Sequence, residues 1–307
     1  MSTAVIPAAG AAAGPAAGPS VGPAAGPSVG PAAMAAASAA VAMARLEAVL
    51  LELASVVVAF SGGADSAFLA SVAHRTLGPD AVLCVTAMSP SLAASDLAHC
   101  RALADEWELN WRVVETSEMD DPLYVANGAD RCARCKDALM AALDPIAVPV
   151  GATVVLGVNT DDLGDYRPGQ AAAAASGARF PLVEAGLSKS DVRELSRELG
   201  LRTWDRPAGA CLASRLPYGT PVTVQRLRAV DVAESGLRAL GLRTLRVRDH
   251  GTVARVEVAE SELDVVWARR EEVVAAVRAA GYDFVALDLE GFRSGSMNRL
   301  LRRSARA

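Results

Sequence analysis

The chain has 307 residues, and 30 Lys and Arg against 35 Asp and Glu give it a formal net charge of −5. At about 150 residues per domain, this length predicts two domains. Hydrophobic residues make up 52% of the chain and charged residues 21%, which is enough apolar material for a core and excludes a wholly disordered protein. The acidic balance disfavours nucleic acid or an anionic membrane surface as a partner, and without an apolar run of about 20 residues we expect no membrane span.

The amino-terminal segment has a composition of its own. Its first charged residue is Arg45, and residues 14–33 repeat Gly, Pro and Ala with an eight-residue period. Repeated Pro and Gly prevent helix and sheet, so residues 1–42 are predicted to be a disordered tail. A signal peptide needs a basic start, which this segment lacks, and we therefore expect a cytoplasmic protein.

From residue 43 to residue 205, short β-branched runs alternate with helical patterns. Strands are predicted over residues 55–60, 81–88, 111–116 and 153–159. Helices are predicted over residues 34–53, 67–78, 91–110 and 188–200. For the last of these, Ser188 with Asp191 three residues on predicts a capping box at the helix start. Because strands that alternate with helices usually pair in parallel, this domain is predicted to be an α/β fold with a doubly wound parallel sheet.

The pattern changes after residue 206. Helices are predicted over residues 222–241 and 261–281, and strands over residues 244–250, 253–259 and 284–289. The order of helix, hairpin, helix and strand is typical of an α+β fold. Residues 206–307 are therefore predicted to form a second, smaller domain.

The sharpest motif is the hexapeptide SGGADS, which lies between the first predicted strand and the helix that follows. Gly62 and Gly63 allow a tight turn that brings backbone N–H groups close to an anion, and the helix start adds its positive end. Ser61 and Ser66 can donate their hydroxyls, and Asp65 can hold Mg²⁺ near a phosphate. The hexapeptide lacks the lysine of a Walker A loop and the third glycine of a dinucleotide fingerprint. It resembles the pyrophosphate loop of ATP pyrophosphatases.

The five cysteines indicate a metal or sulfur site rather than a secreted disulfide framework, because their number is odd and the chain is long. Cys84 and Cys100 lie in apolar or helical surroundings, as buried core thiols do. Cys132 and Cys135 stand two residues apart, a spacing that suits a metal, a cluster or a redox pair, or that belongs to two incidental helix thiols. Zinc would need two more soft ligands, whereas three cysteines, counting Cys211, suit a [4Fe–4S] cluster with one open iron.

Basic side chains accompany these cysteines. Arg131, Arg134 and Lys136 flank the first pair and would stabilise thiolates. Cys211 lies in a loop that Pro and Gly bracket, at the junction of the two predicted domains and four residues before Arg215. It is either a reactive thiol or a half-buried loop cysteine.

Six segments, in this order, resemble the LarE family, which comprises ATP-dependent sulfur transferases of nickel-pincer nucleotide cofactor biosynthesis within the PP-loop ATP pyrophosphatase superfamily. The six are SGGADS, RCARCK, GVNTDDLGDYRPG, FPLVEAGLSKSDVR, CLASRLPYG and LRVRDHGTVARVEV. The resemblance covers about residues 45–290 and leaves out the amino-terminal tail. Members adenylate the carboxylates of pyridinium-3,5-biscarboxylic acid mononucleotide and replace oxygen by sulfur. The resemblance therefore implies ATP and Mg²⁺ as cofactors and a small mononucleotide as the substrate.

Members of this family obtain sulfur in two ways. Some give up the sulfur of one cysteine and end as dehydroalanine, and others hold a [4Fe–4S] cluster on three cysteines that carries an added sulfide. By this resemblance Cys211 is the sulfur-bearing cysteine, and Cys132 and Cys135 are the extra pair of the cluster-bearing members. Because both extra cysteines are present, we favour the cluster-dependent route.

The resemblance also implies binding residues. Arg215, Arg246 and Arg248 resemble the basic residues that face the substrate phosphate, and the last two share one face of a predicted strand because they are two positions apart. Glu234 resembles an acidic pocket residue that binds a divalent ion, with a surface helix carboxylate as the alternative. Lys189 resembles the lysine that approaches the phosphates of ATP.

A polar loop follows the fourth predicted strand, at the strand ends where ligands bind in such sheets. It carries four charged residues, Asp161, Asp162, Asp165 and Arg167. The sequence does not single out which of them contacts nucleotide. Loss of sulfur from Cys211 itself would need a base, for which His250 is a candidate by residue type alone.

Two other kinds of protein fit the same ATP loop. A tRNA thiolase or an amide-forming synthetase would use it for another adenylation, and a nucleotide sensor would bind ATP or AMP without chemistry. A thiolase should carry an RNA-binding appendage, which the net charge of −5 disfavours, and an amidotransferase would need a glutaminase domain. We therefore expect an adenylating, pyrophosphate-releasing sulfur transferase, and the family resemblance implies a homo-oligomer.

Overall fold

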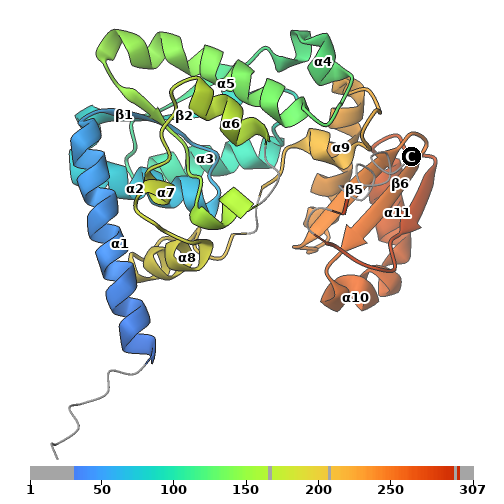
Figure 1. Ribbon diagram of the computed structural model, residues 1–307. Coiled ribbons are helices and arrows are strands. Elements are labelled where there is room, and N and C mark those ends of the chain that lie inside the picture. The colour runs from blue at the N-terminus through green and yellow to red at the C-terminus, as the bar shows by residue number, and fades with distance from the viewer. Residues whose placement is uncertain (1–30, 165–167, 207–208, 294–295, 298–307) are drawn as a thin grey trace, which may run out of the picture.

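The structure, a computed structural model, describes residues 31–164, 168–206, 209–293 and 296–297. Within these ranges the chain forms two layered units, the first around a four-stranded sheet and the second around a three-stranded sheet (Figure 1). Residues 1–30 of the predicted tail lie outside the described residues. No helix in the described ranges is long and apolar enough to cross a bilayer.

The first sheet has the strand order β3-β2-β1-β4, and every pair in it is parallel. Its strands are β1 (Val56–Ala59), β2 (Val82–Met88), β3 (Trp111–Glu115) and β4 (Thr153–Val155). The predicted parallel sheet is confirmed. β4 ends four residues before the predicted end. On its side away from β1, Val155 forms an isolated parallel bridge with Arg179, in which the N–H of Leu156 donates to the carbonyl of Arg179 at 3.1 Å.

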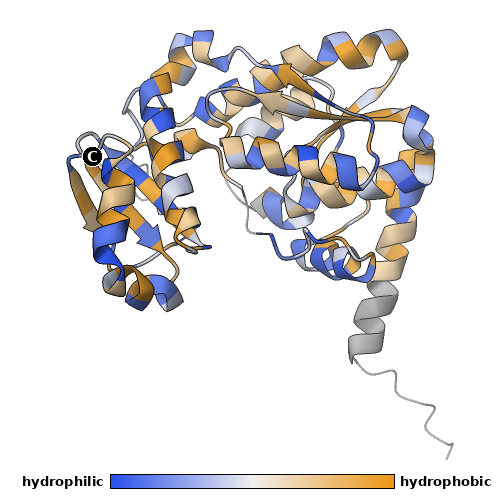
Figure 2. Cartoon of the chain, turned by 180° about the vertical axis from the view of Figure 1, so that it is seen from behind, coloured by the Kyte–Doolittle hydropathy of each residue, from blue (hydrophilic) through white to orange (hydrophobic). Residues whose placement is uncertain are grey.

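Helices cover both faces of this sheet, so it is doubly wound. One face carries α1 (Pro31–Leu53), α2 (Ala64–Leu77), α3 (Ala94–Glu106) and α8 (Lys189–Glu198). The other carries α5 (Arg131–Ala147) and α6 (Pro168–Ala175). In β1, Val56 and Val58 pack into the first layer and Val57 into the second, which is why this strand is apolar at every position. Figure 2 shows the apolar strands between the two helical layers.

The structured part of the chain begins earlier than the domain boundary predicted at residue 43, and close to the start of the helix predicted over residues 34–53. Helix α1 starts at Pro31, and Ala39, Ala42, Leu46 and Leu50 pack into the core at intervals of three and four residues. This spacing places them on one face of the helix. The helix therefore belongs to the first domain and is not part of a tail.

The helix α5 and three shorter helices were not predicted. The shorter ones are α4 (Pro122–Val125), α6 and α7 (Pro181–Glu184). In α5, Leu139, Met140 and Leu143 are buried at helical spacing, although its first turn is charged. That charged turn obscures the apolar periodicity at the amino-terminal end of the helix.

The second unit is the predicted smaller α+β domain. Strands β5 (Leu245–His250) and β6 (Val253–Val258) form an antiparallel hairpin, and β7 (Phe284–Leu287) pairs parallel to β6. Its helices are α9 (Val224–Ala239), α10 (Leu263–Ala268) and α11 (Arg270–Arg278). The predicted helix over residues 261–281 is interrupted at Arg269, whose guanidinium donates to the carbonyl of Leu240 at 2.6 Å.

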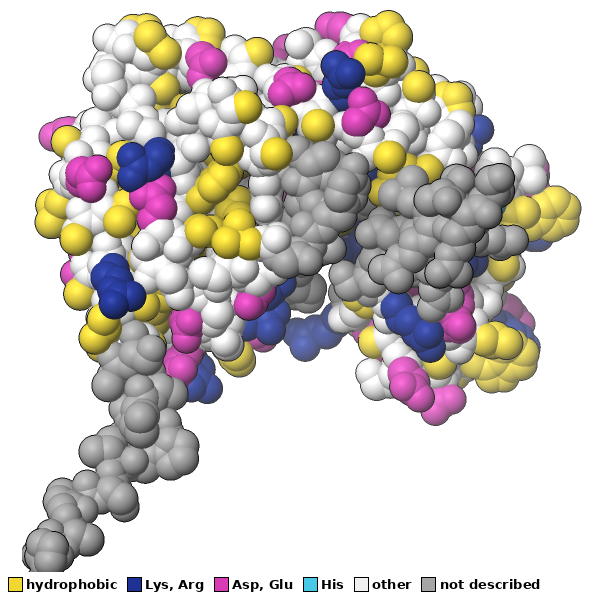
Figure 3. Space-filling view, in the orientation of Figure 1, with side chains coloured by type: hydrophobic (Ala, Val, Ile, Leu, Met, Phe, Trp, Pro, Cys, Tyr) yellow, Lys and Arg dark blue, Asp and Glu magenta, His cyan; other side chains and the backbone are white. Residues whose placement is uncertain are grey.

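A separate buried cluster joins the two units. It contains Tyr124 from α4, Leu212 and Leu216 from the loop that leads into the second unit, and Leu227 and Val230 from α9. The junction is therefore a packed core and not a bare linker. Over the face in Figure 3, acidic and basic side chains are intermixed around both units.

Candidate active site

The hexapeptide SGGADS forms the turn between β1 and α2, as predicted. Gly62 has φ +66°, and a Cβ there would lie 3.0 Å from Sγ of Cys100 and 3.1 Å from Cδ2 of His99. Gly63 occupies the cap of α2 with no side-chain cap, which leaves the first N–H groups of the helix available for an anion. The hydroxyl oxygens of Ser61 and Ser66 lie 2.9 Å apart and close the turn.

The end of β4 meets the start of α2. A Cβ on Gly157 would lie 2.7 Å from the backbone nitrogen of Ser66, so only glycine allows this approach. Two residues on, the side-chain amide of Asn159 donates to Oδ1 of Asp65 at 3.1 Å. Burial raises the pKa of Asp65, while the Asn159 hydrogen bond and the charge of Lys189 act against that rise. Asp65 therefore lies at the meeting point of two strand ends, where ligands bind in such sheets.

Lys189 begins α8 and lies half-buried near Asp65. Its N–H donates to Oδ2 of Asp161 at 2.9 Å, and Ser188 and Asp191 form the predicted capping box. The loop after β4 is thus tied to the start of α8. Of the four charged loop residues, Asp165 and Arg167 lie outside the described residues, and Asp162 is buried.

The three candidate cluster cysteines lie in one region at the junction. Cys132 and Cys135 are in the first two turns of α5, and Cys211 immediately precedes the short 3-10 helix η5 (Leu212–Arg215). Burial and then the charge of Cys211 raise the pKa of Cys135 to about 12. Within the described parts of the chain, however, no three His, Cys, Asp or Glu side chains are close enough together to hold a metal ion. By contrast, Cys84 and Cys100 are fully buried core thiols.

Buried polar side chains that the sequence did not single out lie beside these thiols. The hydroxyl of Ser91 donates to Oε1 of Glu118 at 3.3 Å, and its carbonyl accepts from the N–H of Leu212 at 2.8 Å. Tyr124 is buried, and its pKa is raised by burial first and then by Cys211 and Cys135. Glu118 precedes α4 by a few residues with no motif of its own, so no sequence signal marked it.

Arg215 and Glu234 form a buried bidentate ion pair. Nε and one terminal nitrogen of Arg215 donate to the two oxygens of Glu234 at 2.8 and 3.0 Å. Arg238 adds a contact of 2.8 Å and the N–H of Val247 one of 3.1 Å. Burial would raise the pKa of Glu234, but the hydrogen bond and charge of Arg215 bring it below its ordinary value. Glu234 is thus engaged by two guanidiniums, and the divalent ion there stays a prediction.

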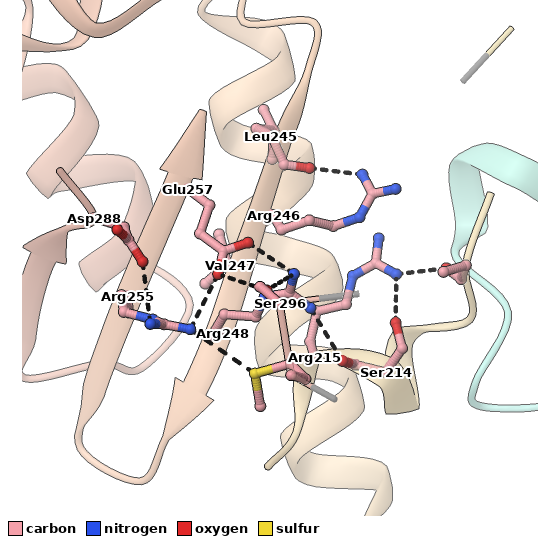
Figure 4. A network of polar contacts seen from close by, with 12 residues as sticks. Ser214, Arg215, Leu245, Arg246, Val247, Arg248, Arg255, Glu257, Asp288 and Ser296 are labelled. Atoms are coloured by element: carbon pink, nitrogen blue, oxygen red, sulfur yellow. Dashed lines mark hydrogen bonds and ion pairs between the residues drawn. The ribbon is translucent and has the colours of Figure 1, made fainter. Parts of the chain in front are cut away.

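Arg215, Arg246 and Arg248 come together from η5 and β5 (Figure 4). Arg215 donates to the carbonyl of Cys211 at 3.0 Å, which joins this group to the cysteine loop. Arg248 donates to Glu257 at 2.7 Å and to the carbonyl of Ser214 at 3.1 Å. Burial, and after it the charge of Arg215, lowers the pKa of Arg246 to about 10.

His250 is at the exposed end of β5. Its pKa is lowered by burial and then by Arg255, and the other charges that act on it are Asp249, Arg248 and Glu257. Its surroundings are therefore those of the hairpin, and no contact with Cys211 supports its role as a base.

Comparisons with known proteins show which family the chain belongs to. The NAD synthase family matches residues 43–132, which include the glycine turn and α2. The chain is 38% identical over 259 residues to the pyridinium-3,5-bisthiocarboxylic acid mononucleotide synthase of Lactiplantibacillus plantarum, covering 84% of this chain and 94% of that protein. The chain belongs to the LarE family of PP-loop sulfur transferases.

Two uncharacterised proteins are also similar to this chain over most of its length. An uncharacterised protein of Synechocystis sp. is 44% identical over 253 residues, which cover 81% of this chain and 94% of that protein. An uncharacterised protein of Methanocaldococcus jannaschii is 26% identical over 240 residues, which cover 78% and 91%.

Proposed function

We propose that this protein uses ATP to adenylate the carboxylates of pyridinium-3,5-biscarboxylic acid mononucleotide and converts them to thiocarboxylates. The relative from L. plantarum, named for the bisthiocarboxylic product, supports this substrate. One observation carries the proposal: three arginines gather beside Cys211, and the buried Nε of Arg248 has no hydrogen-bond partner among the described residues. An unpaired buried donor among like charges suits an anion, which the substrate phosphate supplies.

The nucleotide half of the reaction belongs to the first domain. The backbone N–H groups of the glycine turn and of the first residues of α2 would bind the pyrophosphate of ATP, and Lys189 would add positive charge. Asp65 fits a Mg²⁺ ligand because it is a carboxylate beside this turn, and the bound ion would neutralise charge on the departing pyrophosphate. A carboxylate is a poor electrophile, since its leaving group would be oxide. Transfer of AMP to that oxygen makes it a good leaving group.

The sulfur half belongs to the junction. A sulfur nucleophile attacks the acyl adenylate, a C–S bond forms, the C–O bond breaks and AMP leaves. Cys132, Cys135 and Cys211 would hold a [4Fe–4S] cluster, because thiolates are the donors that such clusters use. In the described residues the three thiols are not grouped closely enough for a metal ion, so the two cysteine segments would have to draw together around the cluster. When bound, such a cluster supplies an open iron that can hold an added sulfide. Arg215 would keep the loop of Cys211 beside the substrate phosphate.

We expect the protein to act in the cytoplasm on this small molecule as a homo-oligomer, with neither nucleic acid nor a membrane as a partner. The net charge of −5 supports the absence of a polyanionic partner.

The test is pyrophosphate release from ATP in the presence of the pyridinium dicarboxylate mononucleotide. Asp65→Ala should slow release by at least about a hundredfold, because charge stabilisation at the departing pyrophosphate is lost. Glu184→Gln, on the surface of α7, is the control and should release pyrophosphate at the wild-type rate. Release that does not depend on the dicarboxylate, or that Asp65→Ala leaves unchanged, would refute the proposal. A nucleotide sensor would release none.

The same assay examines the arginines. Arg246→Ala should raise the KM for the mononucleotide by at least about tenfold and leave the KM for ATP unchanged, because a charge-assisted phosphate contact contributes about 1.5–3 kcal/mol. Equal effects on both substrates would remove Arg246 from the phosphate site.

A further inference from the structure

Arg131 is a buried guanidinium between the two segments that carry the cysteines. It is the first residue of α5, and only 4% of it is exposed. One terminal nitrogen donates to Oδ1 of Asn127 and, at 2.9 Å, to the carbonyl of Ala213 in η5. Its guanidinium also lies 5.6 Å from the ring centroid of Tyr218. A single side chain of the first domain thus contacts the loop of Cys211 at two points.

Asn127, a residue of the first domain, also holds the loop that follows Cys211. It is fully buried, and its backbone has φ +58°, a region that asparagine tolerates better than most residues. Its side-chain amide donates to the carbonyls of Pro217 and Thr220, both at 2.8 Å. Its own carbonyl accepts from the N–H of Gly219 at 3.0 Å. The loop after Cys211 therefore takes its position from Asn127 and Arg131 together.

The same guanidinium also lies beside the thiol of Cys132. Its other terminal nitrogen is 4.0 Å from Sγ of Cys132. Arginine remains protonated in proteins, so this is a permanent positive charge between the two cysteine segments.

We propose that Arg131 and Asn127 form a clamp that positions Cys211 against Cys132 and Cys135 for sulfur transfer. The inference rests on the proposed function, because it concerns how the cysteines of that reaction are brought together. Arg131 is a positioning residue: it fixes the loop through Ala213 and keeps a cation beside sulfur that becomes negatively charged. Arg134, one turn along the same helix face, pairs instead with Asp130 at 3.2 Å on the surface.

Thiol cross-linking tests the clamp without any need for turnover. The full chain, purified without added iron, is treated with dibromobimane, which fluoresces when it bridges two nearby thiols, and bridged peptides are identified by mass spectrometry. We expect the wild type to give a bridge between Cys211 and either Cys132 or Cys135. Arg131→Gln should reduce its yield by at least about tenfold, the factor that corresponds to 1.4 kcal/mol. Arg134→Gln is the matched control and should keep the yield.

Two further variants keep the test decisive if Arg131→Gln does not fold. Arg131→Lys keeps the positive charge but lacks the planar guanidinium that donates to both Asn127 and Ala213. Its bridge yield should therefore fall while the protein stays folded. Asn127→Asp keeps the acceptor for Arg131 and the left-handed backbone but loses the two donors to Pro217 and Thr220. Its bridge yield should lie between those of the wild type and Arg131→Gln. Thermal midpoints report folding in each case.

Kinetics then separate the clamp from the proposed function. In thiocarboxylate formation, Arg131→Lys should lower kcat by about tenfold and leave the KM for ATP unchanged, because the nucleotide site is not altered. Wild-type bridge yields in Arg131→Lys and Arg131→Gln, or a lower yield without a lower kcat, would overturn the clamp.

A different outcome would overturn the proposed function, namely a wild-type chain that bridges its thiols but forms no thiocarboxylate. In that case, loss of the bridge in Arg131→Gln would still support the clamp.

Discussion

Two Arg–Glu pairs in this protein have the same bidentate geometry and very different surroundings. The side chains of Arg215 and Glu234 are 4% and 0% exposed, whereas those of Arg179 and Glu184 are 40% and 28% exposed. Breaking a buried pair leaves an unpaired charge away from water, which costs about 3–5 kcal/mol. An exposed pair is solvated in either state and contributes about 0–1 kcal/mol. Burial, and not the contact itself, decides which pair matters.

We therefore expect Glu234→Gln to lower the free energy of unfolding by about 3 kcal/mol or more, because Arg215 and Arg238 lose the charge that they share. The matched change Glu184→Gln should lower it by less than about 1 kcal/mol. Urea unfolding of both variants measures the difference. Similar losses from the two substitutions would mean that Glu234 is not the organising charge of the arginine group.

At the scale of elements, the ATP site depends on how closely β4 approaches α2. Gly157 makes the approach possible, since a Cβ there would meet the nitrogen of Ser66 at 2.7 Å and the carbonyl carbon of Asp65 at 2.9 Å. Both atoms belong to backbone and cannot move alone. A larger residue would shift the whole start of the helix relative to the sheet.

Gly157→Ala should therefore lower the free energy of unfolding by about 1–3 kcal/mol, the usual cost of overpacking, and should also slow pyrophosphate release because Asp65 moves with the helix. Gly209→Ala is the control, since a Cβ there meets nothing within 4 Å. Thermal unfolding and the release assay are measured on both. Normal release by Gly157→Ala would show that the approach serves packing alone.

At the scale of the whole molecule, the junction cluster makes the two domains depend on each other. Leu216 is buried there with Tyr124 and Leu227, which come from different domains. Leu245 is equally buried but lies only in the core of the second domain. Loss of either side chain leaves a cavity, which costs about 2–5 kcal/mol.

The two leucines should differ in which transition they affect. Leu216→Ala should separate calorimetric unfolding into two transitions, because it weakens the contact through which one domain stabilises the other. Leu245→Ala should lower only the unfolding temperature of the second domain. One undivided transition in Leu216→Ala, shifted as in Leu245→Ala, would show that the junction does not couple the domains.

The sequence by itself determined the features that depend on neighbours along the chain. The β-branched run before SGGADS predicted β1, and the glycines after it predicted the turn into α2, because backbone preference and apolar periodicity act over a few residues. The capping box at Ser188 and Asp191 was predicted for the same reason. The hydrophobic layers followed from these patterns, and so did the division into a parallel-sheet domain and an α+β domain.

Only the tertiary structure decided which distant residues meet. Arg131 and Ala213 are 82 positions apart, and no local pattern separates the buried Arg131 from the surface Arg134 in the same motif. The burial of Glu234 between two arginines likewise depends on how α9 packs beside η5 and β5. Such contacts arise from chain closure and side-chain packing over long separations, which local residue preferences do not encode.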